Sequence, residues 1–290
     1  MPTCLFNCPA PAKLNLFLHV TGRRADGYHL LQTVFQLIDR CDMLDFTVRD
    51  DGRIVRTNDI PGVPADSDLV VRAARLLQAA SGKLEVGADI TVRKHLPMGG
   101  GLGGGSSDAA TTLLVLNHLW QTGFNRGQLM ALGLQLGADV PFFLLGQNAF
   151  AEGVGEELVP LRTAERWFVV IEPGVSIPTA IIFSSKELTR DTKVVRITDF
   201  PDAHNLVDKG FGRNDLEVVA AKQFPVVAET ISWLKTFGNA RMTGSGACVF
   251  SSFEHEYQAD EVLKQVPSQW HGWKAKAMQE HPLDHLLSAL

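Results

Sequence analysis

The residues best suited to chemistry form a glycine run at positions 99–105, in which six glycines surround one leucine. A strand-like stretch at 90–94 precedes the run, and an apolar helical stretch at 109–120 follows it. Glycine has no Cβ, so a ligand can approach the backbone amides closely. Ser106 and Ser107 are predicted to open the helix, whose first amides and positive dipole end then face the loop. This order of elements predicts a phosphate site, with a plain structural connection as the alternative.

Two common kinds of phosphate loop do not fit the run. A Walker A loop needs a lysine followed by serine or threonine after its last glycine, and this chain has Ser-Ser-Asp there. The glycines do contain the dinucleotide pattern G-x-G-x-x-G. That fold also needs an acid about twenty residues further on to hold a ribose, but no Asp or Glu lies between Asp108 and Asp139. A first βα unit would also place the loop earlier in the chain.

Two charged residues outside the loop are candidates for catalysis. Asp139 lies two residues after Gly137 and two before Pro141 inside an apolar stretch, which is typical of a turn or cap residue. Apolar surroundings can also raise the pKa of a carboxyl group and suit it to general base catalysis. Lys13 belongs to the more polar face of an alternating stretch at 12–20, where a solvated lysine is the common case. Beside a transferring phosphoryl group, it would stabilise developing charge and orient an acid.

Two further segments have both a structural and a functional interpretation. Residues 243–246 form a second glycine-containing turn, which is either a tight connection or a set of amides placed against a phosphate or the first loop. Tyr28 and His29 follow a glycine in a polar loop. Either Tyr28 packs and His29 is exposed, or the two rings stack on a base and bond to it.

Length, composition and charge describe a soluble globular protein. The 290 residues are 45% hydrophobic and 20% charged, which is ordinary for that class. The net charge of −5 leaves no basic excess for a nucleic-acid backbone. No apolar run reaches the ~18 residues of a membrane span, and the N-terminus lacks a signal-peptide pattern. We expect a cytoplasmic protein with no nucleic-acid or membrane partner, whose four cysteines are free thiols.

Hydrophobic periodicity gives a coarse map of the elements. We expect strands at 12–20, 30–37 and 43–48, and helices at 69–80 and 128–136. Gly82 is a plausible stop for the first helix. The character of the sequence changes near residue 155, which divides the chain into 1–155 and 156–290. His281 and His285 have helical spacing but lack the glutamate of the zinc motif, so they are predicted to lie on a solvated face.

Several segments together resemble the successive motifs of the GHMP small-molecule kinases. These segments are Pro11-Ala-Lys-Leu-Asn-Leu, the loop 97–107, Leu136-Gly-Ala-Asp-Val-Pro and Thr243-Gly-Ser-Gly-Ala. Members of the family that act on a cytidyl-methylerythritol substrate have further motifs. This chain has four segments similar to those motifs: Gly22-Arg-Arg-Ala-Asp-Gly-Tyr-His, Pro97-Met-Gly-Gly-Gly-Leu-Gly-Gly-Gly-Ser-Ser, Gly174-Val-Ser-Ile-Pro-Thr and Asn214-Asp-Leu-Glu. The resemblance runs from Pro11 to Cys248, and the set is far more specific than any one motif.

The resemblance implies a two-domain α+β GHMP kinase fold. Residues 1–155 would form a ribosomal S5-like domain that binds ATP and carries the catalytic residues, and 156–290 a ferredoxin-like C-terminal domain. The implied reaction transfers the γ-phosphate of ATP to the 2-hydroxyl of 4-diphosphocytidyl-2-C-methyl-D-erythritol, in the non-mevalonate isoprenoid pathway. The implied partners are small molecules, and the enzyme would be a monomer or a weak homodimer. The alternatives are a GHMP kinase of the homoserine or mevalonate type, or a non-catalytic nucleotide-binding regulator.

The same resemblance assigns roles to individual residues. Asp139 would take the hydroxyl proton, and Lys13 would orient Asp139 and offset charge. The residues that would wrap the ATP phosphates are Pro97, Met98, Gly99, Gly100, Gly101, Leu102, Gly103, Gly104, Gly105, Ser106 and Ser107. The substrate would be held by Asn15, Tyr28, His29, Val154 and Thr179, with Tyr28 and His29 on the cytosine. Mg²⁺ is expected with ATP, and Ser107 is the candidate protein ligand.

One position departs from the family pattern. Some relatives carry asparagine where this chain has Asp68, and the asparagine amide can contact adenine. A carboxylate accepts hydrogen bonds but cannot donate them. This substitution makes nucleotide preference harder to predict than the reaction.

Overall fold

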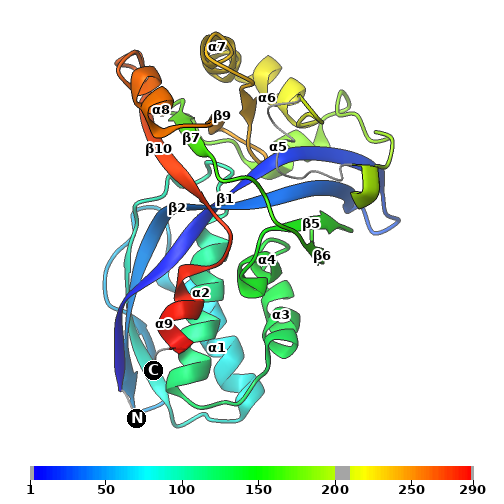
Figure 1. Cartoon of the computed structure of the whole chain (residues 1–290). Coiled ribbons are helices and arrows are strands. Elements are labelled where there is room, and N and C mark those ends of the chain that lie inside the picture. Colours follow the sequence, from blue (N-terminus) through cyan, green and yellow to red (C-terminus); the bar gives the residue numbers. More distant parts are fainter. Residues whose placement is uncertain (1–2, 200–209, 289–290) are drawn as a thin grey trace.

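The computed structural model describes residues 3–199 and 210–288 and has two lobes (Figure 1). The strands are β1 (Cys4–Arg23), β2 (His29–Arg49), β3 (Ile54–Arg56), β4 (Gly87–Arg93), β5 (Ala149–Glu152), β6 (Glu157–Pro160), β7 (Trp167–Glu172), β8 (Arg241–Met242), β9 (Val249–Phe253) and β10 (His271–Met278). The α-helices are α1 (Leu69–Ser81), α2 (Gly104–Leu119), α3 (Arg126–Leu134), α4 (Val140–Leu145), α5 (Thr179–Ser184), α6 (Glu217–Gln223), α7 (Pro225–Leu234), α8 (Glu256–Leu263) and α9 (Pro282–Ser288). Two short 3₁₀ turns are Ala65–Ser67 and Ile197–Asp199.

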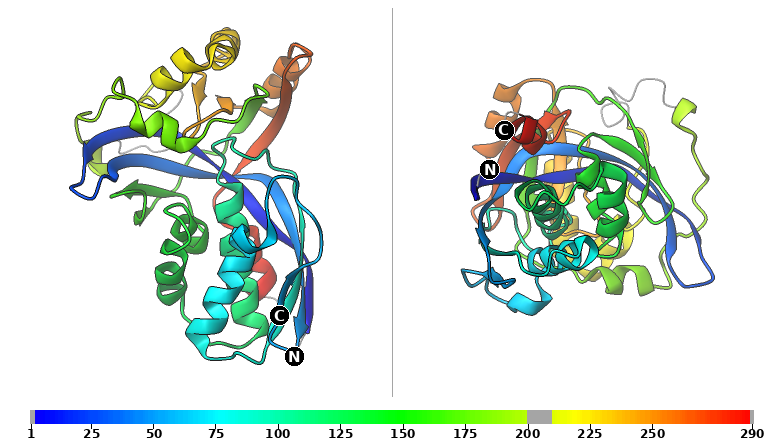
Figure 2. Two further views of the ribbon diagram at one scale, coloured as in Figure 1. Left: turned by 180° about the vertical axis from the view of Figure 1, so that it is seen from behind. Right: turned by 90° about the horizontal axis from the view of Figure 1, so that it is seen from below.

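Two long antiparallel strands form the frame of both lobes. β1 and β2 pair from Cys4 opposite Thr47 to Arg23 opposite His29, and both run from the lower lobe into the upper one (Figures 1 and 2). Register shifts along the pair mark bulges, which bend and twist strands. The predicted strands 30–37 and 43–48 are therefore one continuous strand. The polar residues between them do not end β2, because β1 continues to pair with it there.

The lower lobe packs helices against one face of this frame. α1, α2 and α4 share a buried core with β1, β2 and β4. The predicted helix 69–80 is confirmed as α1, and Gly82 ends it in the left-handed conformation. The prediction that Ser106 and Ser107 open α2 is wrong by one half-turn. The helix starts at Gly104, and Gly103, at φ 74°, holds the N-cap position without a side-chain cap bond.

The upper lobe continues the same sheet. β10 pairs with the middle of β2 and with β7, so the order along the sheet is β3-β4-β2-β10-β7-β9-β8. Helices α6, α7 and α8 lie in this lobe (Figure 1), where a second buried core forms. A third buried cluster joins residues of β1 and β2 to Phe168, Phe250 and Trp273 of the upper lobe. The two lobes therefore share packed side chains as well as strands.

The last described helix returns to the lower lobe. α9 lies beside α2 in Figure 1, and Leu283 is fully buried in the core that contains β1 and α2. His281, predicted to be solvated, is also fully buried, and burial lowers its pKa to about 3. His281 Nδ1 accepts a hydrogen bond from the Leu283 amide at 3.1 Å. The division into 1–155 and 156–290 stays a prediction, and α9 belongs to the second range while packing on the first.

Candidate active site

One cavity of about 1010 Å³ takes residues from both lobes. All but one of the predicted site residues line it. They are Lys13, Asn15, Tyr28, His29, Asp139, Val154, Thr179 and the loop residues from Pro97 to Ser106. Ser107 does not line the cavity, because its side chain is fully buried in the first turn of α2. Segments separated by more than a hundred residues therefore meet in one place.

A lysine and an aspartate lie side by side in this cavity. Lys13 Nζ is 3.7 Å from Asp139 Oδ2, 2.6 Å from Asn15 Oδ1 and 2.9 Å from the Gly101 carbonyl oxygen. The Lys13 side chain is only 4% exposed, whereas that of Asp139 is 34% exposed. Burial lowers the pKa of Lys13, and the Asp139 carboxylate opposes that shift. The solvated interpretation of Lys13 is therefore wrong, because its side chain is buried.

The backbone of Asp139 starts α4, while its side chain faces Lys13. Asp139 holds the N-cap position of α4, yet its carboxylate makes no capping hydrogen bond. Val140 to Leu144 are buried and anchor the helix. The carboxylate thus points to Lys13 on a fixed backbone, and its oxygens are not used to stabilise the helix.

The glycine loop presents its amides because its carbonyls are held from behind. The carbonyls of Gly99, Gly100 and Leu102 accept hydrogen bonds from the amides of Ala247, Cys248 and Lys13, at 3.3, 3.1 and 3.0 Å. In a trans peptide the N–H points opposite to the C=O. The amides that follow these carbonyls therefore point away from those partners. Such a row of outward amides in front of a helix N-terminus suits an anion.

The second glycine-containing turn supports the first loop. Thr243 Oγ1 accepts a hydrogen bond from the Asn15 amide at 3.0 Å. Asn214 Nδ2 donates to the carbonyls of Met242 and Gly244, both at 2.8 Å, and so holds the turn in place. Thr243 Oγ1 also donates to the Gly101 carbonyl at 3.4 Å, so the turn lies against the first loop. Gly244, Ser245 and Gly246 line the cavity too, and their contact with a phosphate stays a prediction. Asn214 was visible in the sequence only as part of a motif, with no signal for this contact.

A third group of lining residues is aromatic. Tyr28 is 64% exposed, and the His29 ring lies 4.9 Å from that of Phe183. Thr179 Oγ1 is 2.8 Å from Ser245 Oγ, so α5 is tied to the second turn. Phe183 was missed by sequence reasoning, because nothing distinguishes it from an ordinary core residue.

The chain matches known proteins over its whole length. Residues 68–147 match the model "GHMP kinases N terminal domain" and residues 200–272 match "GHMP kinases C terminal". The 4-diphosphocytidyl-2-C-methyl-D-erythritol kinase of Janthinobacterium sp. (strain Marseille) is 69% identical over 290 residues, with 99% of each chain covered. The chain belongs to this family of GHMP kinases. The predicted family, enzyme class and two-domain α+β GHMP kinase fold are confirmed.

Solved structures agree with this assignment to the GHMP kinases. A crystal structure of 4-(cytidine 5'-diphospho)-2C-methyl-D-erythritol kinase superposes with a TM-score of 0.74 at 34% identity, covering 93% of this chain and 98% of that one. A homoserine kinase from Cytophaga hutchinsonii superposes almost as well, with a TM-score of 0.73, but at 14% identity. At that identity the likeness shows the fold alone.

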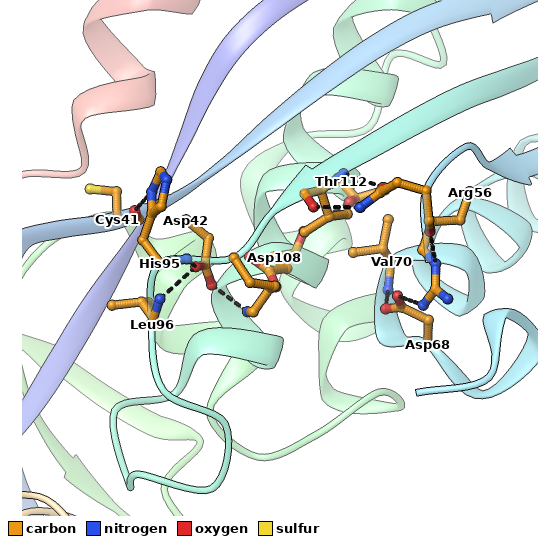
Figure 3. Close-up of polar contacts among 12 residues, drawn as sticks. Cys41, Asp42, Arg56, Asp68, Val70, His95, Leu96, Asp108 and Thr112 are labelled. Carbon is orange, nitrogen blue, oxygen red and sulfur yellow. Dashed lines mark hydrogen bonds and ion pairs between the residues drawn. The ribbon is translucent and has the colours of Figure 1, made fainter. Parts of the chain in front are cut away.

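A buried charge cluster joins the two ends of this GHMP kinase's glycine loop. Lys94, just before the loop, contacts the carboxylates of Asp42 on β2 and Asp108 on α2. Asp42 Oδ1 also accepts hydrogen bonds from the backbone amides of His95 and Leu96, at 2.5 and 2.8 Å (Figure 3). Burial raises the pKa of Asp108 to about 7, although Lys94 opposes the shift. Sequence reasoning missed Asp42, because nothing in the sequence distinguishes it from the neighbouring Asp39 and Asp45.

The departure at Asp68 has a structural explanation. Asp68 Oδ1 accepts a hydrogen bond from the Val70 amide at 2.9 Å and so caps α1. Its Oδ2 forms an ion pair with Arg56 Nη1 at 2.6 Å (Figure 3). Both side chains of the ion pair are buried. Asp68 lines the cavity, but each of its oxygens already has a protein partner. In this chain the carboxylate stabilises the helix and anchors Arg56.

Gly101 offers a direct test of the loop's backbone. It has φ 76°, and a Cβ there would lie 2.2 Å from the Thr243 carbonyl oxygen. Gly101→Ala is expected to raise the KM for ATP by about tenfold or more, since left-handed strain alone costs about 1–3 kcal/mol.

The matched control is Gly82→Ala, at φ 71° with nothing within 4 Å of the added Cβ. It should lower the free energy of urea unfolding by about 1 kcal/mol and leave the KM for ATP unchanged. Equal effects of the two substitutions on the KM would contradict a special role for the loop conformation.

Proposed function

We propose that this protein transfers the γ-phosphate of ATP to the 2-hydroxyl of 4-diphosphocytidyl-2-C-methyl-D-erythritol, a step of the non-mevalonate isoprenoid pathway. The observation that carries the proposal is the Lys13–Asp139 pair, which shares one cavity with the glycine loop and with Tyr28 and His29. Two relatives that are 69% identical to the chain carry the corresponding name. Phosphoryl transfer needs mainly positioning and charge stabilisation, and this cavity supplies groups for both.

In the proposed reaction Asp139 is the general base. Its carboxylate takes the proton of the acceptor hydroxyl while the hydroxyl oxygen forms a bond to the γ-phosphorus. The bond between the γ-phosphorus and the β,γ-bridging oxygen breaks, and ADP leaves with the electron pair. Lys13 holds Asp139 in place and balances negative charge on the transferred group. Lys13 is itself fixed by Asn15 and by the Gly101 carbonyl.

The remaining site residues divide between the two ligands. Residues 97–107 would bind the ATP phosphates through the outward amides and the N-terminus of α2. The substrate would contact Asn15, Tyr28, His29, Val154 and Thr179, with Tyr28 and His29 on the cytosine ring. Residues 1–155 would then be the ATP-binding part, and residues 156–290 would complete the substrate side.

Ser107 fits a role beside magnesium by its chemistry. Its Oγ is buried and has no hydrogen-bond partner in the described part of the chain. A hydroxyl oxygen is a donor of the kind that Mg²⁺ prefers, and Mg²⁺ usually takes few protein ligands beside phosphates and water. Bound with ATP, the ion would neutralise phosphate charge. The residues 3–199 and 210–288 contain no cluster of three or more His, Cys, Asp or Glu that could hold it alone.

We further propose a cytoplasmic enzyme that acts on small molecules as a monomer or weak homodimer, with no nucleic-acid or membrane partner. The net charge of −5 supports the absence of a polyanion partner. Among the helices of the described residues, none has the length and apolar character needed to cross a bilayer.

A coupled assay of ADP release tests the function. The purified protein with Mg²⁺ and ATP should phosphorylate the cytidyl-methylerythritol substrate and leave mevalonate and homoserine unchanged. Turnover of either of those, without turnover of the cytidyl compound, would replace the proposed substrate. Absence of turnover with all three would favour a nucleotide-binding regulator.

A further inference from the structure

The imidazole of His29 is fixed in one tautomer by its neighbour. Arg190 Nε, which always carries a proton, donates a hydrogen bond to His29 Nε2 at 3.0 Å. Nε2 therefore has no proton, and the neutral ring carries its proton on Nδ1. Within residues 3–199 and 210–288, no hydrogen-bond partner occupies Nδ1. His29 lines the cavity, so Nδ1–H is the donor left for a ligand.

Arg190 is itself held firmly. Its Nη1 donates to the Leu188 carbonyl at 3.0 Å, and its Nη2 donates to the carbonyls of Phe183 and Ser185, at 2.9 and 2.7 Å. The guanidinium thus joins the C-terminal end of α5 to His29. Arg190 is not among the residues that line the cavity, so it acts on a ligand through His29.

The charges around the ring agree with this tautomer. Burial lowers the pKa of His29, and the positive charges of Arg190 and Arg23 lower it further. A second proton on Nε2 would also point at the N–H of Arg190. Near neutral pH the ring is therefore neutral and presents one N–H.

We infer that Arg190 is a positioning residue that sets base specificity, because it holds His29 as the Nδ1–H donor that selects cytosine over uracil. The inference rests on the proposed function. N3 of cytosine accepts a hydrogen bond, whereas N3 of uracil carries a proton and donates. A fixed donor at His29 matches the first base and opposes the second. A histidine free to change tautomer would not discriminate in this way.

The first test reads the tautomer directly, without any substrate. In ¹⁵N NMR of the histidine rings at pH 7.5, His29 should show a protonated Nδ1 and an unprotonated Nε2. The spectrum of His29→Gln assigns the signals. In Arg190→Met the ring should move toward the Nε2–H form, which an unconstrained histidine prefers. Arg190→Lys keeps a donor and the charge and should retain the Nδ1–H form.

The second test compares kcat/KM for the cytidyl substrate and its uridyl analogue. The full-length wild-type protein should prefer the cytidyl compound by about 10- to 100-fold, the cost of one mismatched donor pair. In Arg190→Met most of this preference should vanish through a higher KM for the cytidyl compound, with kcat changed by less than about threefold. Arg49→Met is the matched control. Arg49 also bridges two partners, Asp51 and Asp89, but lies outside the cavity lining, so the preference should persist.

The outcomes separate this inference from the proposed function. A wild-type His29 that is protonated on Nε2 would overturn the inference whatever the assay shows. A changed tautomer in Arg190→Met with an unchanged base preference would overturn it as well. Failure of the wild type to phosphorylate the cytidyl compound would overturn the proposed function and, with it, the base specificity. If Arg190→Met does not fold, the wild-type spectrum and Arg190→Lys decide the tautomer.

Discussion

Replacing Asp139 with asparagine is expected to lower kcat by about 10³-fold, the usual scale for loss of a general base. Asparagine has the same shape but cannot take the hydroxyl proton. The substitution should not disturb α4, since the Asp139 side chain makes no capping hydrogen bond. The measurement is steady-state ADP release at saturating ATP and substrate. The KM for ATP should change much less than kcat, because the amides of the glycine loop are untouched.

The control for Asp139→Asn is Asp66→Asn. Asp66 also pairs with a basic residue, Arg75, but its side chain is 86% exposed and outside the cavity lining. Its kcat should match that of the wild type. Full turnover by Asp139→Asn would rule out Asp139 as the base.

The second large effect is expected for Lys13→Met, which should lower kcat by about 10²-fold or more through lost charge stabilisation. The unfolding temperature should not fall in parallel, because a buried ammonium is replaced by an apolar side chain of similar volume. Lys274→Met is the matched control. Lys274 bridges Glu256 and Asp260 on the surface, at 2.7 Å each, and its loss should leave kcat unchanged.

The pH dependence of Lys13 has a definite sign. Burial lowers its pKa in the folded state below the ordinary value of 10.5. As pH rises through this lowered pKa, Lys13 loses its proton and kcat should fall. Over the same window the unfolded chain binds more protons than the folded one, so Lys13's contribution to stability rises with pH.

The fall of kcat at alkaline pH, called the alkaline limb, should be absent from the pH profile of Lys13→Met. It should move to lower pH in Asp139→Asn, which removes the carboxylate that opposes the shift. An alkaline limb that persists unchanged in Lys13→Met would assign it to another group.

From local pattern the sequence predicted that the glycine loop, Lys13 and Asp139 belong to one site. The structure places all three in one cavity, and their roles stay a prediction. Glycines with positive φ in front of a helix leave a plain signal, and the two charged residues fell into family motifs. Alternation predicted the strand at 12–20 but left Lys13 on its more polar face, where a solvated lysine is the common case. In the structure Lys13 and its neighbour Asn15 are buried, because the glycine loop and the turn at Thr243 cover that face. The periodicity of one strand carries no information about Thr243, which covers Asn15 from 228 residues further along the chain.

Other site residues were out of reach for a similar reason. Asp42 has no local signal for its contact with Lys94, 52 residues away, and Arg190 is 161 residues from His29. The Asp68 departure was visible, but its partner Arg56 was not, so the carboxylate was considered only against a nucleotide. Contacts of this kind depend on how the two lobes fold around β1 and β2.

The return of α9 to the lower lobe bears on how the protein is made. Leu283 completes a core whose other members come mainly from β1, β2, β4, β5 and the helices α1 to α4. A ribosome delivers α9 after every other described element. While α9 is still to be made, the part of the lower lobe's core that Leu283 covers has no partner. Apolar surface of this kind makes a partly folded chain prone to aggregate, so protection by a chaperone would matter most before α9 packs.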